Sequence, residues 1–324
     1  MKLVKYLYVF LCLSLLALGG CGKRVEANVT EKEQKIPAKN EGETDKKGEY
    51  ETGIPAYVEW ESVNLGEGVF VFSVNEDGNI FVLTEDGNIK TYTKTGEIKQ
   101  TYPNCIDFTA FCCENNNLYA YDAVKNEIVW IDFETGNRRI VTEEFDAEEV
   151  LKMEKVGNDI YMLIVPENYQ GMKGENEYID FQECLYRVSI TDGSQEKLMI
   201  DNIIAIYAAG NGKLYYYAYQ NDTYVLCEYD TVTGEDYVCY DMMEAFGVKY
   251  LSAFVYEQDM FVYSELVTPC IHSISLKDGA EMYCSEDIFI FSGKDVDCVQ
   301  GNVVCLGYAI DGTPRKLQSF FVDQ

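Results

Sequence analysis

The sequence predicts an all-β fold built from repeated units, and three observations support this. Short runs rich in aromatic and β-branched residues recur from Val69 to the end of the chain, as pleated strands require. A turn with Thr-Gly or Asp-Gly closes each unit except the last. These turns carry glycines at regular positions, which are Gly96, Gly136, Gly193, Gly234 and Gly279. A short segment at 242–246 is the one candidate for a helical turn.

The spacing of the turn glycines indicates the kind of repeat. Successive spacings are 40, 57, 41 and 45 residues. A period near 45 with several short strands per unit is typical of a β-propeller blade. Six copies are visible, and their second strands start at Asn79, Asn117, Asp159, Lys213, Asp259 and Asn302. The sequence therefore predicts a six-bladed β-propeller.

Within each blade the strands are named a to d from the centre outward. Apolar runs before the copies are expected to be the innermost strands, a, at 69–74, 108–113, 205–208 and 252–256. The two runs inside each copy are b and c. The run after the glycine turn is d, as at 138–141 and 237–240.

The two ends of the repeat region predict how the ring closes. The sixth copy ends at Asp323-Gln324, where its strand c should turn into strand d, so its outer strand is missing. The segment Tyr57–Leu65 precedes the first strand a and is left over. We expect this N-terminal strand to complete the last blade, three strands plus one, which removes an open edge.

The N-terminus has the organisation of an export signal. A basic start, Met1–Lys5, is followed by an uncharged apolar run, Leu7–Leu18, which is shorter than the ~20 residues that span a bilayer. The run ends in Leu18-Gly19-Gly20-Cys21, which resembles the bacterial lipobox. The resemblance implies a lipoprotein signal peptide at 1–20 and a diacylglyceryl group with palmitate-type acyl chains on Cys21. The implied location is the extracytoplasmic face of the cell membrane.

Charge separates the rest of the chain into two regions. Residues 21–55, the lipidated cysteine and a charged segment, are expected to be a flexible tether, since they carry too few apolar residues for a core. Residues 56–324, the propeller domain, hold 17 basic and 47 acidic residues. This acidity argues against nucleic acid and anionic membrane surfaces as partners. It is compatible with cationic ligands, metal ions or basic protein patches.

Ten cysteines remain beyond Cys12 and Cys21, and none forms a Cys-x-x-Cys pair. Cys112 and Cys113 are adjacent and should point to opposite faces of a strand. Most of the others fall within apolar strand patterns and are expected to be small buried hydrophobes with free thiols. With one histidine and no ligand spacing, a zinc site is not expected.

The residues offer little for catalysis. The single histidine, His272, falls in the predicted strand c of the fifth blade, where a packing role is expected. The segments Asn75–Asn79 and Glu85–Asn88 have oxygen ligands at calcium-like spacing, but both also match ordinary hairpin turns, which we favour. No catalytic residue, metal ligand or cofactor is assigned.

An insertion in the third blade is the candidate ligand-binding element. Residues 166–182 lie between its strands b and c, and the b–c turns share a face with the d–a connections. Long loops in compact domains are often functional. The candidate ligand-binding side chains in it are Tyr169, Tyr178, Asp180 and Phe181. Together with the connection Asp241–Tyr250, the insertion is expected to shape a ligand face.

The repeat count and turn pattern over 56–324 resemble the six-bladed propellers of the TolB-like group. Lipobox, charged tether and propeller together resemble clostridial surface lipoproteins, in some of which a propeller precedes the solute-binding domain of a sugar importer. The expected function is non-catalytic, a cell-surface binding or scaffold lipoprotein for a protein partner or an extracellular glycan. The alternatives are a propeller-type polysaccharide lyase or glycosidase, and an accessory component of a sugar import system.

Overall fold

A computed structural model describes most of residues 69–246 and the strands of the C-terminal part. The described residues are 61–63, 69–93, 95–145, 147–165, 183–200, 202–209, 212–246, 253–255, 260–265, 270–275, 281–286, 288–289, 296–299, 302–309 and 314–321. All belong to one compact unit, Gly53–Gln324. Among these residues, no helix has the length and apolarity needed to cross a membrane.

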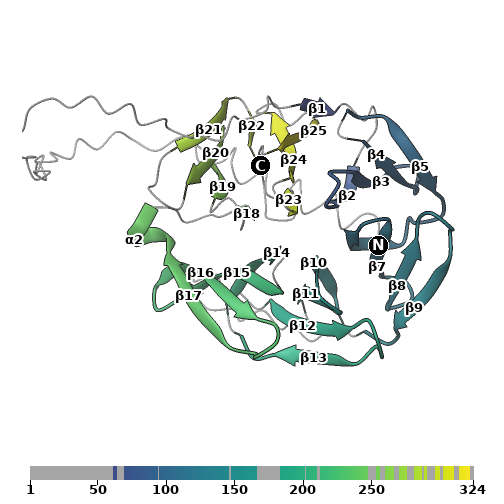
Figure 1. The fold of residues 1–324 in the computed structure, drawn as a ribbon, viewed down its shortest axis with the longest axis horizontal. Helices are drawn as coiled ribbons and strands as arrows, with labels where there is room; N and C mark the ends of the chain where they lie inside the picture. The colour runs from purple at the N-terminus through teal and green to yellow at the C-terminus, as the bar shows by residue number, and fades with distance from the viewer. Residues whose placement is uncertain are drawn as a thin grey trace, which may run out of the picture. The chain divides into compact units, whose positions relative to one another are not determined.

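Four consecutive antiparallel sheets of four strands form the part of the unit from β2 to β17 (Figure 1). The first contains β2 (Val69–Val74), β3 (Ile80–Thr84), β4 (Ile89–Tyr92) and β5 (Ile98–Tyr102). The second contains β6 (Phe108–Glu114), β7 (Asn117–Asp122), β8 (Glu127–Asp132) and β9 (Arg138–Thr142). The third contains β10 (Glu149–Val156), β11 (Asp159–Val165), β12 (Cys184–Ser189) and β13 (Gln195–Leu198). The fourth contains β14 (Ile203–Ala209), β15 (Lys213–Gln220), β16 (Thr223–Asp230) and β17 (Asp236–Asp241).

The C-terminal strands continue the pattern after a short helix, α2 (Met242–Phe246). One sheet of four strands contains β18 (Ala253–Val255), β19 (Met260–Glu265), β20 (Cys270–Ser275) and β21 (Glu281–Glu286). The last sheet contains β22 (Ile288–Phe289), β23 (Val296–Val299), β24 (Asn302–Ala309), β25 (Pro314–Phe321) and β1 (Glu61–Val63). The all-β prediction is confirmed, and the strands a predicted at 69–74, 108–113, 205–208 and 252–256 correspond to β2, β6, β14 and β18.

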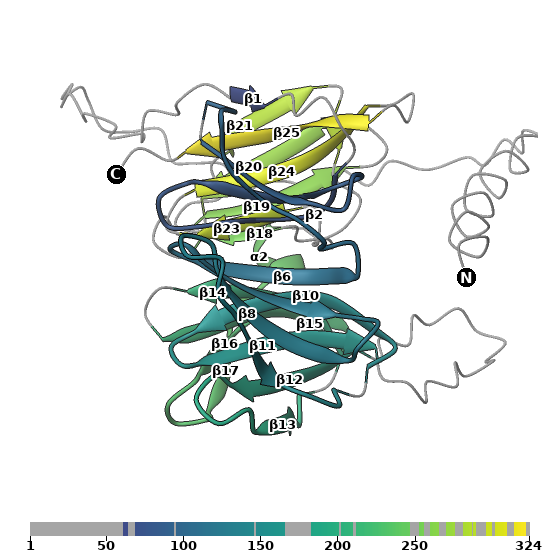
Figure 2. The ribbon, with the colours of Figure 1, turned by 90° about the vertical axis from the view of Figure 1, so that its right-hand side faces the viewer.

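The N-terminal strand closes onto the C-terminal one, as predicted. Glu61, Ser62 and Val63 pair antiparallel with Ser319, Gln318 and Leu317, and β25 pairs with β24 on its other side. Figure 2 shows β1 beside β25 although the two are at opposite ends of the sequence. One detail was not predicted: β22 and β23 both pair with β24, along different parts of it.

The core lies between neighbouring sheets, because each strand alternates its side chains between two sheet faces. One apolar cluster joins the first and second sheets, another joins the second and third, and another joins the third and fourth. Cys113 belongs to the first cluster and Cys112 to the second, so the adjacent cysteines do point to opposite faces. The innermost strands β2, β6, β10 and β14 contact one another in this order.

The predicted glycine turns connect strands c and d. Gly96, Gly136, Gly193 and Gly234 have φ between 71° and 81°, a region that L side chains rarely adopt. In the second sheet, Asp132 Oδ1 accepts backbone N–H bonds from Glu134 and Thr135, at 2.9 and 3.3 Å. Thr135 Oγ1 accepts the backbone N–H of Asn137 at 3.4 Å, and Thr233 Oγ1 that of Glu235 at 3.3 Å, so Asp and Thr satisfy backbone groups of these turns.

Candidate functional site: the d–a face

The b–c turns and the d–a connections, with the strand ends that adjoin them, form one end of the sheets, here named the d–a face. Backbone hydrogen bonds fix each described connection to a neighbouring turn. Cys105 N–H donates to Gly87 O at 2.7 Å, and Ala123 N–H donates to Asp107 O at 3.0 Å. Equivalent bonds join Phe145 to Asn126 and Tyr219 to Asn202, each at 3.0 Å. Turns of successive sheets are thus linked through their backbones.

The same irregularity recurs where each of the first four inner strands begins at this face. The pairing of strands a and b skips one residue, leaving a β-bulge after the first pair in β2, β6 and β14 and after the second pair in β10. The skipped residues are Phe70, Thr109, Leu151 and Ile204. A bulge re-aims side chains near the end of a strand. Three of these four are apolar, and Phe70 is 58% exposed.

Two further exposed apolar side chains lie at the same face, one on the first d–a connection and one on the b–c turn that follows it. Ile106 is 57% exposed in the first d–a connection, and Val124 is 72% exposed in the following b–c turn. A Cβ added to Gly87 would lie 3.2 Å from Ile106 Cβ, so Ile106 sits against the b–c turn of the first sheet. We name Phe70, Ile106 and Val124 the apolar trio.

Buried charges support the turn that carries Val124. Asp122 and Glu127, both nearly inaccessible, are bridged by Lys125 and Arg138, with Nζ to Asp122 Oδ2 at 3.0 Å and Nη2 to Glu127 Oε1 at 2.8 Å. Burial opposes ionisation of Asp122, but the hydrogen bonds from Lys125 outweigh it and lower its pKa. Both cations are therefore already committed to these buried carboxylates.

The exposed charges of the d–a face are almost all negative. The exposed acidic side chains among its described residues are Glu85, Asp86, Asp107, Glu143, Glu144, Glu148, Glu149, Asp222 and Glu244. Lys125 is the exposed basic side chain in the same part of the chain. Asp86 is paired with Lys90 at 3.1 Å, and the hydrogen bond from Thr84 holds its pKa well below the usual range. The others form no ion pair within the described residues.

A second polar group lies among the innermost strands. Lys152 Nζ of β10 lies 3.2 Å from Glu154 Oε1 and 3.9 Å from Asp297 Oδ1 of β23, and 5.5 Å from the centre of the Tyr207 ring. Asp297 Oδ2 also accepts the backbone N–H of Val74 at 2.8 Å. One cation thus holds two carboxylates, and Asp297 ties β23 to β2. The arrangement is a structural ion pair between distant strands.

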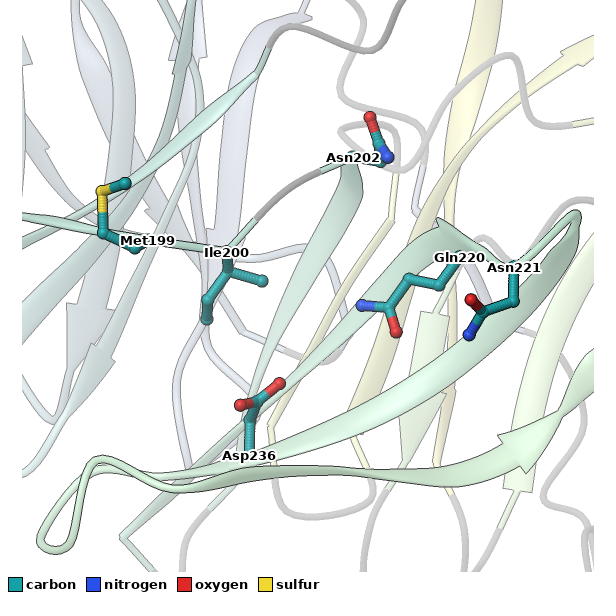
Figure 3. Close-up of a pocket in the computed structure, with 6 residues that line it drawn as sticks. All are labelled: Met199, Ile200, Asn202, Gln220, Asn221 and Asp236. Atoms are coloured by element: carbon teal, nitrogen blue, oxygen red, sulfur yellow. The ribbon is translucent and has the colours of Figure 1, made fainter.

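An open pocket of about 360 Å³ lies where the third and fourth sheets meet (Figure 3). Its lining residues are Met199, Ile200, Asn202, Gln220, Asn221 and Asp236. Three side-chain amides and one carboxylate supply donors and acceptors without a positive charge. Asp236 Oδ2 accepts a hydrogen bond from Tyr216 at 2.5 Å, which fixes the carboxylate.

Several sequence-predicted residues lie outside the described part of the chain. These are Cys21, the tether at 21–55, and the insertion residues Tyr169, Tyr178, Asp180 and Phe181. His272 lies in β20, as predicted, opposite Tyr263 and Cys284. Sequence reasoning missed the apolar trio. Phe70 belongs to an apolar run that predicts burial, and Ile106 and Val124 are single apolar residues in polar loops.

The two calcium-like segments are hairpin turns. Asn75 Oδ1 accepts the N–H of Asn79 at 2.8 Å, and Asp86 Oδ1 accepts the hydroxyl of Thr84 at 2.6 Å. Gly78 and Gly87 have φ of 74° and 77°, as their tight turns require. Within the described residues, no group of three or more His, Cys, Asp or Glu side chains could hold a metal ion.

The comparisons with known proteins define a fold and no family. No protein-family model matches the chain, and no curated protein matches it. Among solved structures, the WD40 repeats of RRP9 superpose with a TM-score of 0.53 at 10% identity, over 82% of this chain and 97% of that chain. BamB from Moraxella catarrhalis has a TM-score of 0.36 at 10% identity, over 80% and 76%. A nidogen/laminin complex has a TM-score of 0.44 at 11% identity, over 78% and 92%.

Of these three superpositions, the one with RRP9 has a TM-score high enough to define a fold, and at 10% identity it defines the fold alone. Its WD40 repeats are propeller blades of four strands. Together with the four-stranded antiparallel sheets of this chain, the similarity assigns it to the propeller-type all-β proteins.

Proposed function

We propose that the protein is a non-catalytic scaffold lipoprotein that presents the d–a face of a six-bladed propeller to a protein partner at the extracytoplasmic side of the cell membrane. Contacts of β18 with β23, and of β23 with β2, support closure of six sheets into one ring. The pairing of β1 with β25 supports the same closure. A closed ring is a rigid support that leaves loops free for binding.

The observation that carries the proposal is the apolar trio. Single exposed apolar residues are ordinary on protein surfaces. Here three lie at one face, and the connections that carry Ile106 and Val124 are joined by the bond from Ala123 N–H to Asp107 O. Neighbouring exposed apolar side chains surrounded by charged residues are typical of sites that bind other proteins.

Site-specific photo-crosslinking tests this function. A photoreactive side chain replaces Val124 in the full-length chain, and the same side chain replaces Val232 as the control, because Val232 is 89% exposed in a c–d turn at the other ends of the strands. Irradiated cells should give a discrete crosslinked protein from position 124 and none from position 232. Equal products from both positions, or none from either, would overturn the proposal.

The lipid anchor is a separate part of the proposal and rests on the lipobox resemblance at Cys21. Cys21→Ser removes the thiol that carries the diacylglyceryl group. The wild-type protein should fractionate with membranes and the variant should leave them. Equal membrane association of the two would show that the anchor is not at Cys21.

The pocket in Figure 3 favours a second candidate, binding of a neutral glycan. Amides and a carboxylate can pair with sugar hydroxyls, and Met199 and Ile200 offer apolar surface to a ring. Thermal denaturation with a panel of neutral oligosaccharides tests it. A ligand at 100 times its dissociation constant stabilises by ~2.7 kcal/mol, and Gln220→Ala should abolish that shift. No shift with any member of the panel would exclude this candidate.

A further inference from the structure

We infer that the partner of the d–a face is a basic protein segment that inserts apolar side chains against Phe70, Ile106 and Val124. The inference rests on the proposed function and adds the chemistry of the partner. It follows from the charge around the trio, from how the cations of this face are used, and from how the trio is held.

Two exposed carboxylates beside Ile106 are available to a partner. Glu85 lies in the b–c turn that Ile106 covers, and Asp107 directly follows Ile106. Both are exposed, and neither forms an ion pair within the described residues. An incoming Lys or Arg would therefore meet carboxylates that no described basic side chain neutralises.

Lys125, the exposed cation of this face, does not compensate that charge. It is bound to Asp122 and Glu127, at 3.0 and 3.5 Å, and Arg138 binds the same two carboxylates. The charges of the two carboxylates and the two cations in this network largely cancel. The net field outside it is set by the unpaired acids, which attract basic partners and repel acidic ones.

The apolar trio provides affinity that charge attraction alone does not. Charge pairs at the rim of an interface mainly affect association rate and partner choice, and buried apolar anchors supply most of the affinity. Phe70 stands on a bulge of β2, and Val124 stands on a turn held by the Asp122 network. Both anchors are positioned before binding, so a partner loses little by ordering them.

The other end of the sheets has a different character. Exposed basic side chains occur there at the described starts of the outer strands, Lys99 and Arg139 among them, next to acidic ones. The exposed Tyr237 at this end is already occupied by hydrogen bonds to Glu228 and Lys213. Exposed apolar side chains also occur at this end, Ile98 and Val232 among them. What distinguishes the d–a face of the described sheets is that its exposed charges are almost all negative.

Defined peptides test the inference by fluorescence anisotropy with the intact propeller chain. One peptide combines Lys, Arg and Leu, a second has Ser for every Leu, and a third has Glu for every Lys and Arg. The first should bind, and the other two should bind at least about tenfold more weakly. Added salt should weaken the first complex without abolishing it.

Variants locate the binding. Phe70→Ser with Val124→Ser should weaken the Lys/Arg/Leu peptide at least about tenfold, and Glu85→Lys with Asp107→Lys should do the same. Val232→Ser with Glu235→Lys, the matched control at the other end of the sheets, should leave its affinity unchanged. Circular dichroism and thermal melting of each variant verify that the fold is intact.

Four results would overturn the inference. Equal binding of the Ser-containing basic peptide would reduce the effect to non-specific charge attraction. Tighter binding of the acidic peptide would exclude a basic apolar partner. Unchanged affinity of the Lys/Arg/Leu peptide for both double variants would exclude it as well. A crosslinked partner at position 124 together with failure of the basic peptide would leave the proposed function standing and this inference refuted.

Discussion

Two glycines with the same backbone conformation provide a direct test of how neighbouring sheets pack. Gly136 and Gly193 occupy equivalent c–d turns of the second and third sheets, with φ of 73° and 71°. An added Cβ at Gly136 meets nothing within 4 Å. At Gly193 it would lie 2.4 Å from the carbonyl oxygen of Val141 in β9, a backbone atom of the adjacent sheet. Gln195 Nε2 donates to Thr142 Oγ1 beside it, at 2.9 Å.

The substitutions Gly136→Ala and Gly193→Ala should therefore differ in cost. Both place a Cβ in the left-handed region, which costs roughly 1–2 kcal/mol. Gly193→Ala must also push β9 and the turn apart, and overpacking of this kind adds about 1–3 kcal/mol. For a domain of this size about 1 kcal/mol lowers Tm by about 2–4 °C, so Gly193→Ala should lower Tm about twice as much as Gly136→Ala.

The assay is thermal and urea denaturation of the two variants beside the wild-type chain. Because the backbone strain is common to both, the difference between their free energies of unfolding measures the contact of Gly193 with Val141. Equal destabilisation by the two substitutions would refute the close packing of the third sheet's turn on β9.

Three other predictions concern charges and thiols. Burial opposes ionisation of Glu228, but hydrogen bonds led by the one from Lys213 lower its pKa below the usual 4.5. Glu228→Gln should therefore destabilise the protein at pH 7. In urea titrations, the difference in free energy of unfolding between wild type and variant should shrink as the pH falls below 4.5. Lys152→Met removes the cation that contacts the carboxylates of Glu154 and Asp297, and should cost about 3–5 kcal/mol in the same titrations; a loss below about 1 kcal/mol would contradict the ion pair. Burial raises the pKa of Cys105 and Cys227 to about 11, so both thiols should react with a thiol reagent far more slowly in the native protein than in the unfolded protein, and rapid native labelling would contradict their burial.

Local pattern was enough to predict most of the sheets. In β15, β16 and their equivalents, aromatic and β-branched residues and a following glycine turn act within a few residues of one another, so sequence alone specifies them. The inner strand β10 gave no such signal, because Lys152 and Glu154 interrupt its apolar pattern. These side chains are charged because they meet Asp297 of a strand far along the chain, a contact that no local pattern contains.

The candidate face was less accessible to sequence reasoning than the sheets. Exposure of Phe70 depends on a one-residue shift in the pairing of β2 with β3, since regular pairing of the same apolar run predicts burial. Ile106 and Val124 lie on connections that are brought together by the hydrogen bond between Ala123 and Asp107, a contact between sheets that no local pattern contains. The insertion at 166–182 was predicted from its length and its aromatic residues, and it remains a prediction.

The proposed function depends first on closure of the ring, because a closed ring would hold the sheets in the positions that bring the trio to one face. Ser62 of β1 and Gln318 of β25 are directly opposite each other. Opposed Cα atoms in antiparallel strands lie about 4.5–5.5 Å apart, within the range of a disulfide. Ser319 is opposite Glu61 instead, and its side chain points to the other face from that of Gln318.

The most direct measurement is therefore disulfide trapping in Ser62→Cys with Gln318→Cys, with Ser62→Cys and Ser319→Cys as the matched control. Peptide mass spectrometry after mild oxidation should find the 62–318 disulfide in high yield and little of the 62–319 disulfide. The 62–318 chain should also melt at a higher temperature when oxidised than when reduced. Absence of the 62–318 bond, or equal yields in the two chains, would contradict a ring closed by the N-terminal strand.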